Sequence, residues 1–403
     1  MRIVKLAAVI CMMLQLLCLP RAAAAVSQPY MEYLSAWASL AVYNDKLGLL
    51  AREVLGEYGW QIEFVTEQTD RSDVKVLLAQ KQEAGQPIYL AAISGTASAQ
   101  DIKTDLRTGS AVFGGSTPEQ FSAFMEDGAL TDDKPLVHRG FCQYVQDGFF
   151  LRRHDEKSGM TLGEMMAKLL HGNQQAKLYI TGHSLGGAAA ELLAARLSDM
   201  GVPSAQMQTI TFGAPAVGNQ RFVDAYEDRL NLTRITMQGD PVKNLAQIAN
   251  DRFVQFKTAE QWTLPYSEAD KFAHGMLLYF DRAMCRYYSQ AQVEAEIENS
   301  GIPISVSFDF PPEIADTEKY IELAVKDSFR HKNISLDPGQ SIAYRFQAEQ
   351  IREDTSNKRY YINSVKYIRT ADGKVISYSG AAADTKEMTV AQAALYAAYQ
   401  CDK

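Results

Sequence analysis

The chain has 403 residues, a formal net charge of −8 and a hydrophobic fraction of 47%. This length is sufficient for one large domain and a smaller one, and the composition is ordinary for a globular protein. The acidic balance argues against binding to nucleic acid or to an anionic membrane surface.

The first 25 residues are predicted to be a secretory signal peptide. Arg2 and Lys5 precede an apolar run over residues 6–19, and four alanines follow at 22–25. A basic start, an apolar middle and a small-residue exit are typical of a cleaved signal, whereas a membrane span needs about 20 apolar residues. We therefore expect a mature chain that begins near Val26 and is secreted, periplasmic or held at the cell surface. An uncleaved N-terminal anchor is the alternative.

Residues 26–295 are predicted to form an α/β domain. Apolar residues recur at helical spacing over residues 30–56, and strands and helices alternate after them. This alternation predicts a mostly parallel central sheet flanked by helices. We expect strands at residues 60–66, 87–94, 178–181, 208–212 and 233–238, and helices at residues 186–200 and 222–230.

Residues 296–403 are predicted to form a small β-rich module. Residues 302–310 alternate apolar and polar side chains, as a half-buried antiparallel strand does, and residues 342–348 repeat the pattern. Residues 361–378 are typical of a hairpin because Asp372-Gly373 stands at the turn. A terminal helix is expected at residues 389–400.

Three cysteines follow the predicted signal peptide, namely Cys142, Cys285 and Cys401. An odd number allows at most one disulfide. None of the three lies in a nucleophile motif, so we interpret them as small buried hydrophobic residues. The sequence contains no visible cluster of metal ligands, and we expect neither a metal nor an organic cofactor.

The residues around Ser184 predict a nucleophile. Residues 182–186 read Gly-His-Ser-Leu-Gly, which is a G-x-S-x-G motif between an expected strand and an expected helix. A sharp turn there lifts the serine hydroxyl above the sheet, and the first turn of the helix directs free N–H groups toward the same point. We expect the N–H of Leu185 to bind an oxyanion. His183 is assigned a packing role, because on so tight a turn its side chain points elsewhere.

A second oxyanion donor is expected after an earlier strand. The strand at residues 87–94 ends in Ser94-Gly95-Thr96. Gly95 permits a bend there, and Thr96 then presents its backbone N–H. An ordinary turn at the end of the strand is the alternative.

Asp240 and His274 are the candidate acid and base. In this kind of hydrolase the acid and then the histidine follow the serine in the chain. Asp240 comes directly after an expected strand, and Pro241 stiffens the loop. Only two histidines follow Asp240, and His331 falls within the β-rich module, so His274 is the better candidate. It would serve as general base toward Ser184 and then as general acid.

These blocks together resemble the class 3 lipases, the fungal-lipase-like family of α/β-hydrolases. The similar blocks are residues 93–96, V-H-R-G-F at 137–141, G-H-S-L-G-G at 182–187, F-G-A-P-A-V-G-N at 212–219, Asp240-Pro241-Val242, and His274 with Tyr279 after it. The resemblance covers roughly residues 30–285. It implies Ser184, Asp240 and His274 as a catalytic triad, the amides of Thr96 and Leu185 as the oxyanion hole, and a structural role for His138.

Three features depart from the family pattern. Ser94 replaces a usual arginine, and the segment from Asp240 to His274 is short. The segment of residues 97–135 is long and lies where the family carries its lid. The apolar side chains of that segment form either a lid face or the core of an inserted helix; they are Phe113, Phe121, Phe124, Met125 and Leu130.

The sequence therefore predicts a secreted serine carboxylic-ester hydrolase, of the lipase type, that acts on acylglycerols. Its partners would be a lipid or small ester substrate and, transiently, a lipid interface. A phospholipase and a short-chain carboxylesterase are the alternatives within the same chemistry. A non-catalytic binding protein that uses a hydrolase scaffold is the alternative from a different class.

Overall fold

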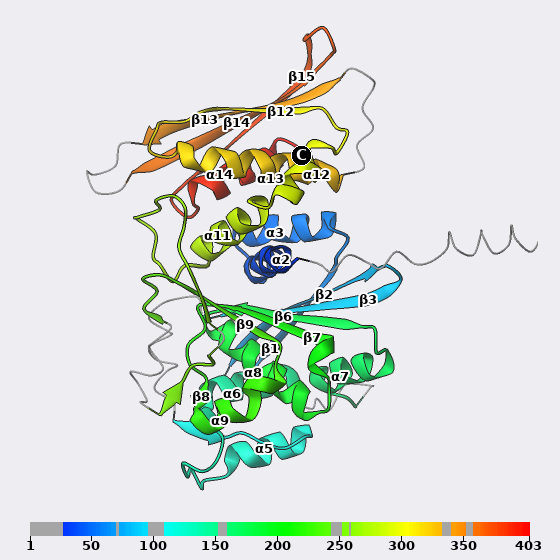
Figure 1. Cartoon of the computed structure of the whole chain (residues 1–403), viewed down its shortest axis with the longest axis vertical. Helices are drawn as coiled ribbons and strands as arrows, with labels where there is room; N and C mark the ends of the chain where they lie inside the picture. The colour runs from blue at the N-terminus through cyan, green and yellow to red at the C-terminus, as the bar shows by residue number, and fades with distance from the viewer. Residues whose placement is uncertain are drawn as a thin grey trace, which may run out of the picture.

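The computed structural model describes residues 27–69, 72–95, 109–151, 159–242, 252–257, 259–332, 340–351 and 358–403 (Figure 1). The predicted signal peptide, residues 1–25, and the predicted oxyanion residue Thr96 lie outside these ranges. Within them, no helix has both the length and the apolar character that crossing a lipid bilayer requires.

A seven-stranded sheet forms the centre of the chain, in the order β1-β2-β3-β6-β7-β9-β11. Strands β3, β6, β7, β9 and β11 pair in parallel, and β1 and β2 join at one edge through antiparallel pairings. The predicted α/β class with a mostly parallel sheet is thus confirmed. The strands are β1 (Gln61–Gln68), β2 (Asp73–Glu83), β3 (Gln86–Ile93), β6 (Lys177–His183), β7 (Met207–Phe212), β9 (Leu232–Met237) and β11 (Ala259–Trp262).

Helices cover both faces of this sheet (Figure 1). On one face lie α2 (Gln28–Ala41), α3 (Lys46–Glu57) and α11 (Met276–Tyr288). On the other lie α6 (Arg139–Val145), the π-helical turn η1 (Gln146–Phe150), α7 (Leu162–Gly172), α8 (Leu185–Asp199) and α9 (Gln220–Tyr226), with α5 (Pro118–Glu126) beyond them. Short 3₁₀ turns occupy Ser204–Gln206, Glu227–Arg229 and Ala315–Thr317.

Local sequence explains where several of these helices begin. Ser27, Asp45 and Thr161 each accept a hydrogen bond from a backbone N–H in the first turn of α2, α3 and α7, and these N–H groups have no partner within the helix. Helix α8 begins differently, because its N-terminal neighbour Ser184 makes no side-chain cap. Its first half is rich in glycine and alanine, which lets it lie close to β6 and β7.

A small sheet of four short strands lies beside α6 and α9, in the order β10-β8-β5-β4. Its pairings are antiparallel and join segments that are far apart in the sequence. The strands are β4 (Ser110–Val112), β5 (Leu136–His138), β8 (Gly218–Asn219) and β10 (Phe253–Val254).

The C-terminal part contains a third sheet, in the order β12-β13-β14-β15, with α13 and α14 on one side of it (Figure 1). The predicted hairpin forms between β14 and β15, and Gly373 in its turn has a φ of +81°. The elements are α12 (Ala291–Glu298), β12 (Ile304–Asp309), α13 (Glu318–Arg330), β13 (Ser341–Ile351), β14 (Arg359–Arg369), β15 (Val375–Asp384) and α14 (Val390–Gln400).

One feature of this part differs from the prediction. Strand β12 pairs in parallel with β13, not antiparallel. The reason is helix α13, which lies between the two strands in the chain and provides the crossover that a parallel pair needs. The alternating pattern of β12 indicates that one face of the strand is covered. It does not show whether the neighbouring strand runs parallel or antiparallel.

One apolar core joins the C-terminal part to the large sheet. A single cluster of buried side chains contains Trp37 of α2, Phe280 of α11, Ile321 of α13 and Leu395 of α14. The helices of the N-terminal segment lie between the large sheet and the C-terminal helices (Figure 1). Buried side chains from both sides of the predicted boundary at residue 296 therefore share this core, and the boundary itself stays a prediction. Cys142, Cys285 and Cys401 are all buried free thiols, in agreement with their interpretation as buried hydrophobic residues.

Candidate active site

Ser184 occupies a strained turn between β6 and α8. Its φ is +58° and its ψ −124°, a backbone conformation that L-residues rarely adopt and that is common at functional sites. The flanking glycines make the turn possible. A Cβ on Gly186 would lie 2.1 Å from the carbonyl oxygen of Ile93, and one on Gly182 would lie 2.3 Å from the carbonyl oxygen of Gly186. The G-x-S-x-G motif therefore reflects a close approach of three backbone segments.

The hydroxyl of Ser184 is buried, and the residue directly precedes α8. The residue is 2% exposed, and its Oγ has no hydrogen-bond partner among the described residues. Its backbone N–H donates to the carbonyl oxygen of Phe212 at 2.9 Å, which ties the turn to the end of β7. Leu185 is the first residue of α8, so its N–H belongs to the turn that has no intrahelical acceptor. An oxyanion at Ser184 would lie at the positive end of this helix.

The loop after β3 packs directly on this turn. A Cβ on Gly95 would lie 2.5 Å from the carbonyl oxygen of His183. The N–H of Gly95 donates to the hydroxyl of Tyr43 at 2.9 Å, and the hydroxyl of Tyr144 donates to the carbonyl oxygen of Ser94 at 3.0 Å. Two tyrosines that are distant in the sequence, Tyr43 between α2 and α3 and Tyr144 in α6, thus hold the residues that precede Thr96. Sequence reasoning missed both, because nothing near either tyrosine marks such a role.

Asp240 and His274 form a buried hydrogen-bonded pair. The Nδ1 atom of His274 lies 2.9 Å from Oδ2 and 3.1 Å from Oδ1 of Asp240. The N–H of Val242 donates to Oδ1 of Asp240 at 2.8 Å, and the hydroxyl of Tyr279 donates to Oδ2 at 2.5 Å. Burial alone would raise the pKa of Asp240, but the hydrogen bonds and charge of its partners hold it below the ordinary value. Asp240 is therefore a carboxylate that orients the imidazole.

His183 fixes the backbone of His274 instead of acting as a base. Its Nε2 lies 2.6 Å from the carbonyl oxygen of His274, and the two rings are 4.5 Å apart. A carbonyl oxygen only accepts, so this nitrogen carries a proton. Burial and the neighbouring His274 lower the pKa of His183 to about 3, which keeps its imidazole neutral. Its packing role thus includes holding the histidine segment.

Gly213 is where the serine turn and the acid–histidine pair meet. It follows Phe212, which accepts the N–H of Ser184, and its φ is +59°. A Cβ on Gly213 would lie 2.9 Å from Oδ2 of Asp240 and 3.1 Å from Cε1 of His274. Ser184 directly follows β6, Asp240 follows β9, and His274 lies just before α11, with Gly213 at the end of β7 between them. Within the described residues, the buried Nε2 of His274 also lacks a hydrogen-bond partner.

The other candidate histidines lie elsewhere in the fold. His138 is buried, its Nδ1 accepts the N–H of Phe141 at 3.3 Å, and its ring stacks on Phe141 at 4.0 Å. It is the N-cap residue of α6, and the structural role that the resemblance implies for it stays a prediction. His331 ends α13, where it contacts Tyr58 and lies 3.8 Å from Asp327.

A buried ion pair supports the loop behind the site. Arg234 on β9 donates to Glu191 on α8 at 3.1 Å and to the carbonyl oxygen of Ala214 at 3.1 Å. Thr211 donates to the same carboxylate at 3.2 Å. Both charged side chains are about 1% exposed. The pair ties the helix that follows Ser184 to the segment that follows Gly213.

The described part of the predicted lid segment contributes largely to the core. Phe113 and Phe121 enclose the guanidinium of Arg196, which lies 3.7 and 4.1 Å from their ring centres. Met125 is also buried, whereas Phe124 and Leu130 are 41% and 40% exposed. The core alternative therefore holds for Phe113, Phe121 and Met125. Residues 97–108 of the segment lie outside the described ranges.

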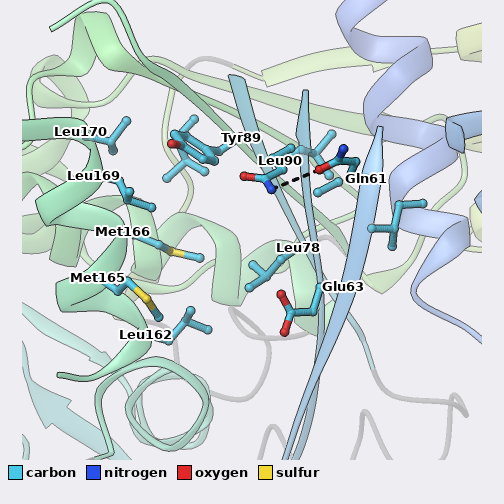
Figure 2. A pocket seen from close by; sticks show the side chains of 14 residues that line it. Gln61, Glu63, Leu78, Tyr89, Leu90, Leu162, Met165, Met166, Leu169 and Leu170 are labelled. Atoms are coloured by element: carbon cyan, nitrogen blue, oxygen red, sulfur yellow. Dashed lines mark hydrogen bonds between the residues drawn. The ribbon is translucent and has the colours of Figure 1, made fainter. Parts of the chain in front are cut away.

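A cavity of about 410 Å³ lies between α7 and strands β1–β3 (Figure 2). Leu162, Met165 and Leu169 of α7 face Leu78 and Tyr89 of the sheet across it. Tyr89 stands near the start of β3, whereas the loop that contacts Ser184 follows the end of this strand. The cavity is therefore at the opposite end of the strands from the serine and is separate from the candidate active site.

Comparison with known families identifies the matching segment. Residues 90–249 match the model of the family described as lipase (class 3). This segment contains Ser184, Leu185 and Asp240 and ends before His274. The resemblance found in the sequence motifs is thus confirmed for this segment.

Three relatives match shorter stretches. They are Toxin TseL of Vibrio cholerae (35% identity over 99 residues, 25% of this chain and 13% of the relative), Lipase ZK262.3 of Caenorhabditis elegans (41% over 76 residues, 18% and 22%), and Secreted mono- and diacylglycerol lipase 1 of Fusarium solani (39% over 77 residues, 19% and 22%). The chain thus spans less than a quarter of the length of each of these relatives.

Proposed function

We propose that this chain, whose residues 90–249 match the class 3 lipases, is a secreted serine carboxylic-ester hydrolase that acts on acylglycerols. One observation carries the proposal. A buried serine hydroxyl at a strained turn and a buried imidazole nitrogen both lack partners among the described residues, and the imidazole is oriented by a carboxylate. A buried polar atom without a partner requires an explanation, and catalysis supplies one for both atoms.

In the proposed mechanism, Ser184 is the nucleophile and His274 the general base. Oγ of Ser184 attacks the acyl carbon while Nε2 of His274 takes the hydroxyl proton. Collapse of the tetrahedral intermediate breaks the bond to the leaving alkoxide, which receives that proton. Water then attacks the acyl-enzyme, His274 again accepts a proton, and the acid product leaves as Ser184 regains its hydrogen.

Asp240 acts through His274 in this scheme. Its carboxylate accepts the Nδ1 proton, so the imidazole presents a bare Nε2 to the serine. The low pKa of Asp240, which its hydrogen-bond partners maintain against the effect of burial, keeps it charged when the imidazolium forms. Its charge then stabilises the imidazolium in a site from which water is largely excluded, since His274 is 3% exposed.

The oxyanion would be stabilised by the N–H groups of Leu185 and Thr96. Leu185 contributes the free N–H at the start of α8, and Gly95 leads the chain across the serine turn toward Thr96. One donor of this kind is worth about 3–4 kcal/mol in transition-state stabilisation.

The substrate proposal rests on similarity to a known lipase. The Fusarium solani relative is a secreted mono- and diacylglycerol lipase. The N-terminal basic and apolar pattern of this chain favours export as well. A phospholipase or a short-chain carboxylesterase would use the same triad with a different acyl or head-group preference.

Labelling with a fluorophosphonate tests the mechanism. Wild-type protein should gain one adduct by mass, located on Ser184 by peptide mapping, and Ser184→Ala should gain none. A series of p-nitrophenyl esters of increasing chain length then tests the lipase preference. No adduct on Ser184 would support a non-catalytic binding protein instead. Activity that peaks at the acetate, with no gain at a lipid interface, would support a short-chain carboxylesterase.

A further inference from the structure

The segment that carries His274 is hydrogen-bonded to the C-terminal part of the chain. This segment, residues 268–277, connects the large sheet to α11. Three of its residues bond to residues 385–392, which we call the C-terminal brace. The brace lies outside the matched family segment, which ends at residue 249.

Gln392 supplies the most buried of these links. It lies in the first turn of α14 and is 1% exposed. Its amide nitrogen donates to the carbonyl oxygen of Leu277 at 2.8 Å and to Oδ1 of Asp281 at 2.7 Å. Leu277 is the second residue of α11, three positions after His274. Gln392 therefore contacts the first turn of this helix from outside it, through a carbonyl oxygen.

Lys271 and Glu268 supply two further links on the other side of His274. Nζ of Lys271 donates to the carbonyl oxygen of Thr385 at 2.6 Å. The backbone N–H of Val390 donates to Oε1 of Glu268 at 3.1 Å. This carboxylate therefore accepts from an N–H at the N-terminus of α14 that has no partner within the helix. The segment is therefore attached to the brace both before and after His274.

His274 is thus held between two parts of the fold. On the side of the serine turn, His183 donates to its carbonyl oxygen at 2.6 Å. On the other side, the brace holds the residues around it. Active-site geometry is demanding, since a displacement of about 1 Å can lower a rate about 100-fold. The backbone of His274 sets the distance between its Nε2 and the hydroxyl of Ser184.

We propose that the C-terminal brace positions His274 for proton transfer, with Lys271 and Gln392 as positioning residues. The inference rests on the proposed function of Ser184 and His274. It assigns a catalytic purpose to a part of the chain that carries none of the predicted triad. Neither residue touches the substrate in this scheme, so both act on the turnover step and not on substrate binding.

Lys271→Met tests the proposal most cleanly. Lys271 is only partly buried, and methionine has a side chain of similar length that cannot donate this hydrogen bond. Lys326→Met is the matched control, since Lys326 bonds to Glu322 within α13 and lies outside the segment. Fluorophosphonate titration first counts the competent sites, and kcat is then expressed per titrated site. This correction removes any loss caused by unfolded protein.

We expect kcat per titrated site to fall about 10- to 100-fold in Lys271→Met, with KM within about twofold. Lys271→Arg, which retains a donor, should recover most of the rate, and Lys326→Met should match wild type. Gln392→Met should show the same kcat loss. An unchanged kcat per site in Lys271→Met, or a loss seen in KM alone, would overturn the proposal. Absence of titratable sites in wild-type protein would instead refute the proposed function.

Discussion

The hydroxyl of Tyr279 joins Asp240 to the strand that precedes it. It donates to Oδ2 of Asp240 at 2.5 Å and accepts the N–H of Met237, the last residue of β9, at 2.8 Å. Burial and the charge of Asp240 raise the pKa of Tyr279 well above its ordinary value, so this hydroxyl keeps its proton. The side chain thus fixes a carboxylate that must hold one orientation.

Tyr279→Phe should weaken catalysis and stability together. Loss of a hydrogen bond to a charged group costs about 1.5–3 kcal/mol, and the N–H of Met237 is left without this acceptor. The pKa of Asp240 should rise toward its ordinary value. A carboxyl group whose pKa is lower in the folded state than in the unfolded state stabilises the protein at pH values above its unfolded-state pKa. This stabilisation is lost as the pH falls through the folded-state pKa. The variant should therefore lose part of this benefit at neutral pH, and its kcat should drop about tenfold.

Urea unfolding at pH 7 and kcat per titrated site measure the two effects of Tyr279→Phe. Tyr378→Phe is the control, because Tyr378 is 76% exposed on β15. Equal behaviour of the two variants in both assays would show that the Tyr279 hydroxyl does not orient Asp240.

Gly213→Ala should abolish activity by displacing the acid–histidine pair. The new Cβ would lie 2.9 Å from Oδ2 of Asp240 and 3.0 Å from the hydroxyl of Tyr279, which is too close for either atom. Gly373→Ala is a matched control because it has a similar positive φ, +81°, with open space around it. The backbone strain is about 1–2 kcal/mol in both variants. We expect a loss of at least about 100-fold in kcat for Gly213→Ala alone, and equal activities would contradict the geometry of the site.

Arg234→Met should destabilise the protein. Removing one partner of a buried ion pair costs about 3–5 kcal/mol because the remaining charge is uncompensated. Methionine leaves the carboxylate of Glu191 without its cation. Burial, opposed by Arg234, raises the pKa of Glu191 to about 7.

The pH dependence of Arg234→Met follows from this raised pKa. When the pKa of a carboxyl group is raised in the folded state, its contribution to stability is fully present at pH values below its unfolded-state pKa. This contribution is lost as the pH rises through the folded-state pKa. Without Arg234 the shift is larger, so the variant should lose more stability at pH 8 than at pH 5 relative to wild type. Thermal unfolding at the two pH values measures this difference in stability. An equal loss of stability at both would show that the carboxylate of Glu191 is not its cause.

Asp281→Asn should reduce the pH dependence of stability. Burial raises the pKa of Asp281 to about 8, and Glu268, Tyr266 and Cys285 lie around it, with Gln392 as a hydrogen-bond donor. The protonated acid is favoured in the folded state. Wild type should therefore lose stability as the pH rises from about 4 to about 8, the interval between the unfolded and folded values.

Asparagine resembles the protonated acid and still accepts from Gln392, so the unfolding temperature of Asp281→Asn should fall less steeply across this interval than that of wild type. Asp224→Asn is the control, since Asp224 lies on α9 and bonds to Gln220 at the surface. A pH dependence in Asp281→Asn as steep as in wild type would show that another group is responsible.

Local features of the fold were predictable because their causes are short-range. The turn at Ser184 requires small residues at 182 and 186, and both are glycines in the sequence. The hairpin turn at Asp372-Gly373 needs a residue that tolerates positive φ. Strand and helix periods likewise repeat over a few residues, so the elements around the site agree with the expected ranges. The predicted antiparallel pairing of β12 was wrong because periodicity does not encode strand direction.

The sequence by itself determined the chemical types at the site: a serine at a strained turn, a carboxylate after a strand, and a histidine at the start of a helix. Only the tertiary structure decided how they are held. The tyrosines at 43, 144 and 279, His183 as a support for His274, and the C-terminal brace all act across long chain separations. Such contacts depend on which faces of the sheet and helices pack together, and that is set by burial of the whole apolar core rather than by any local pattern.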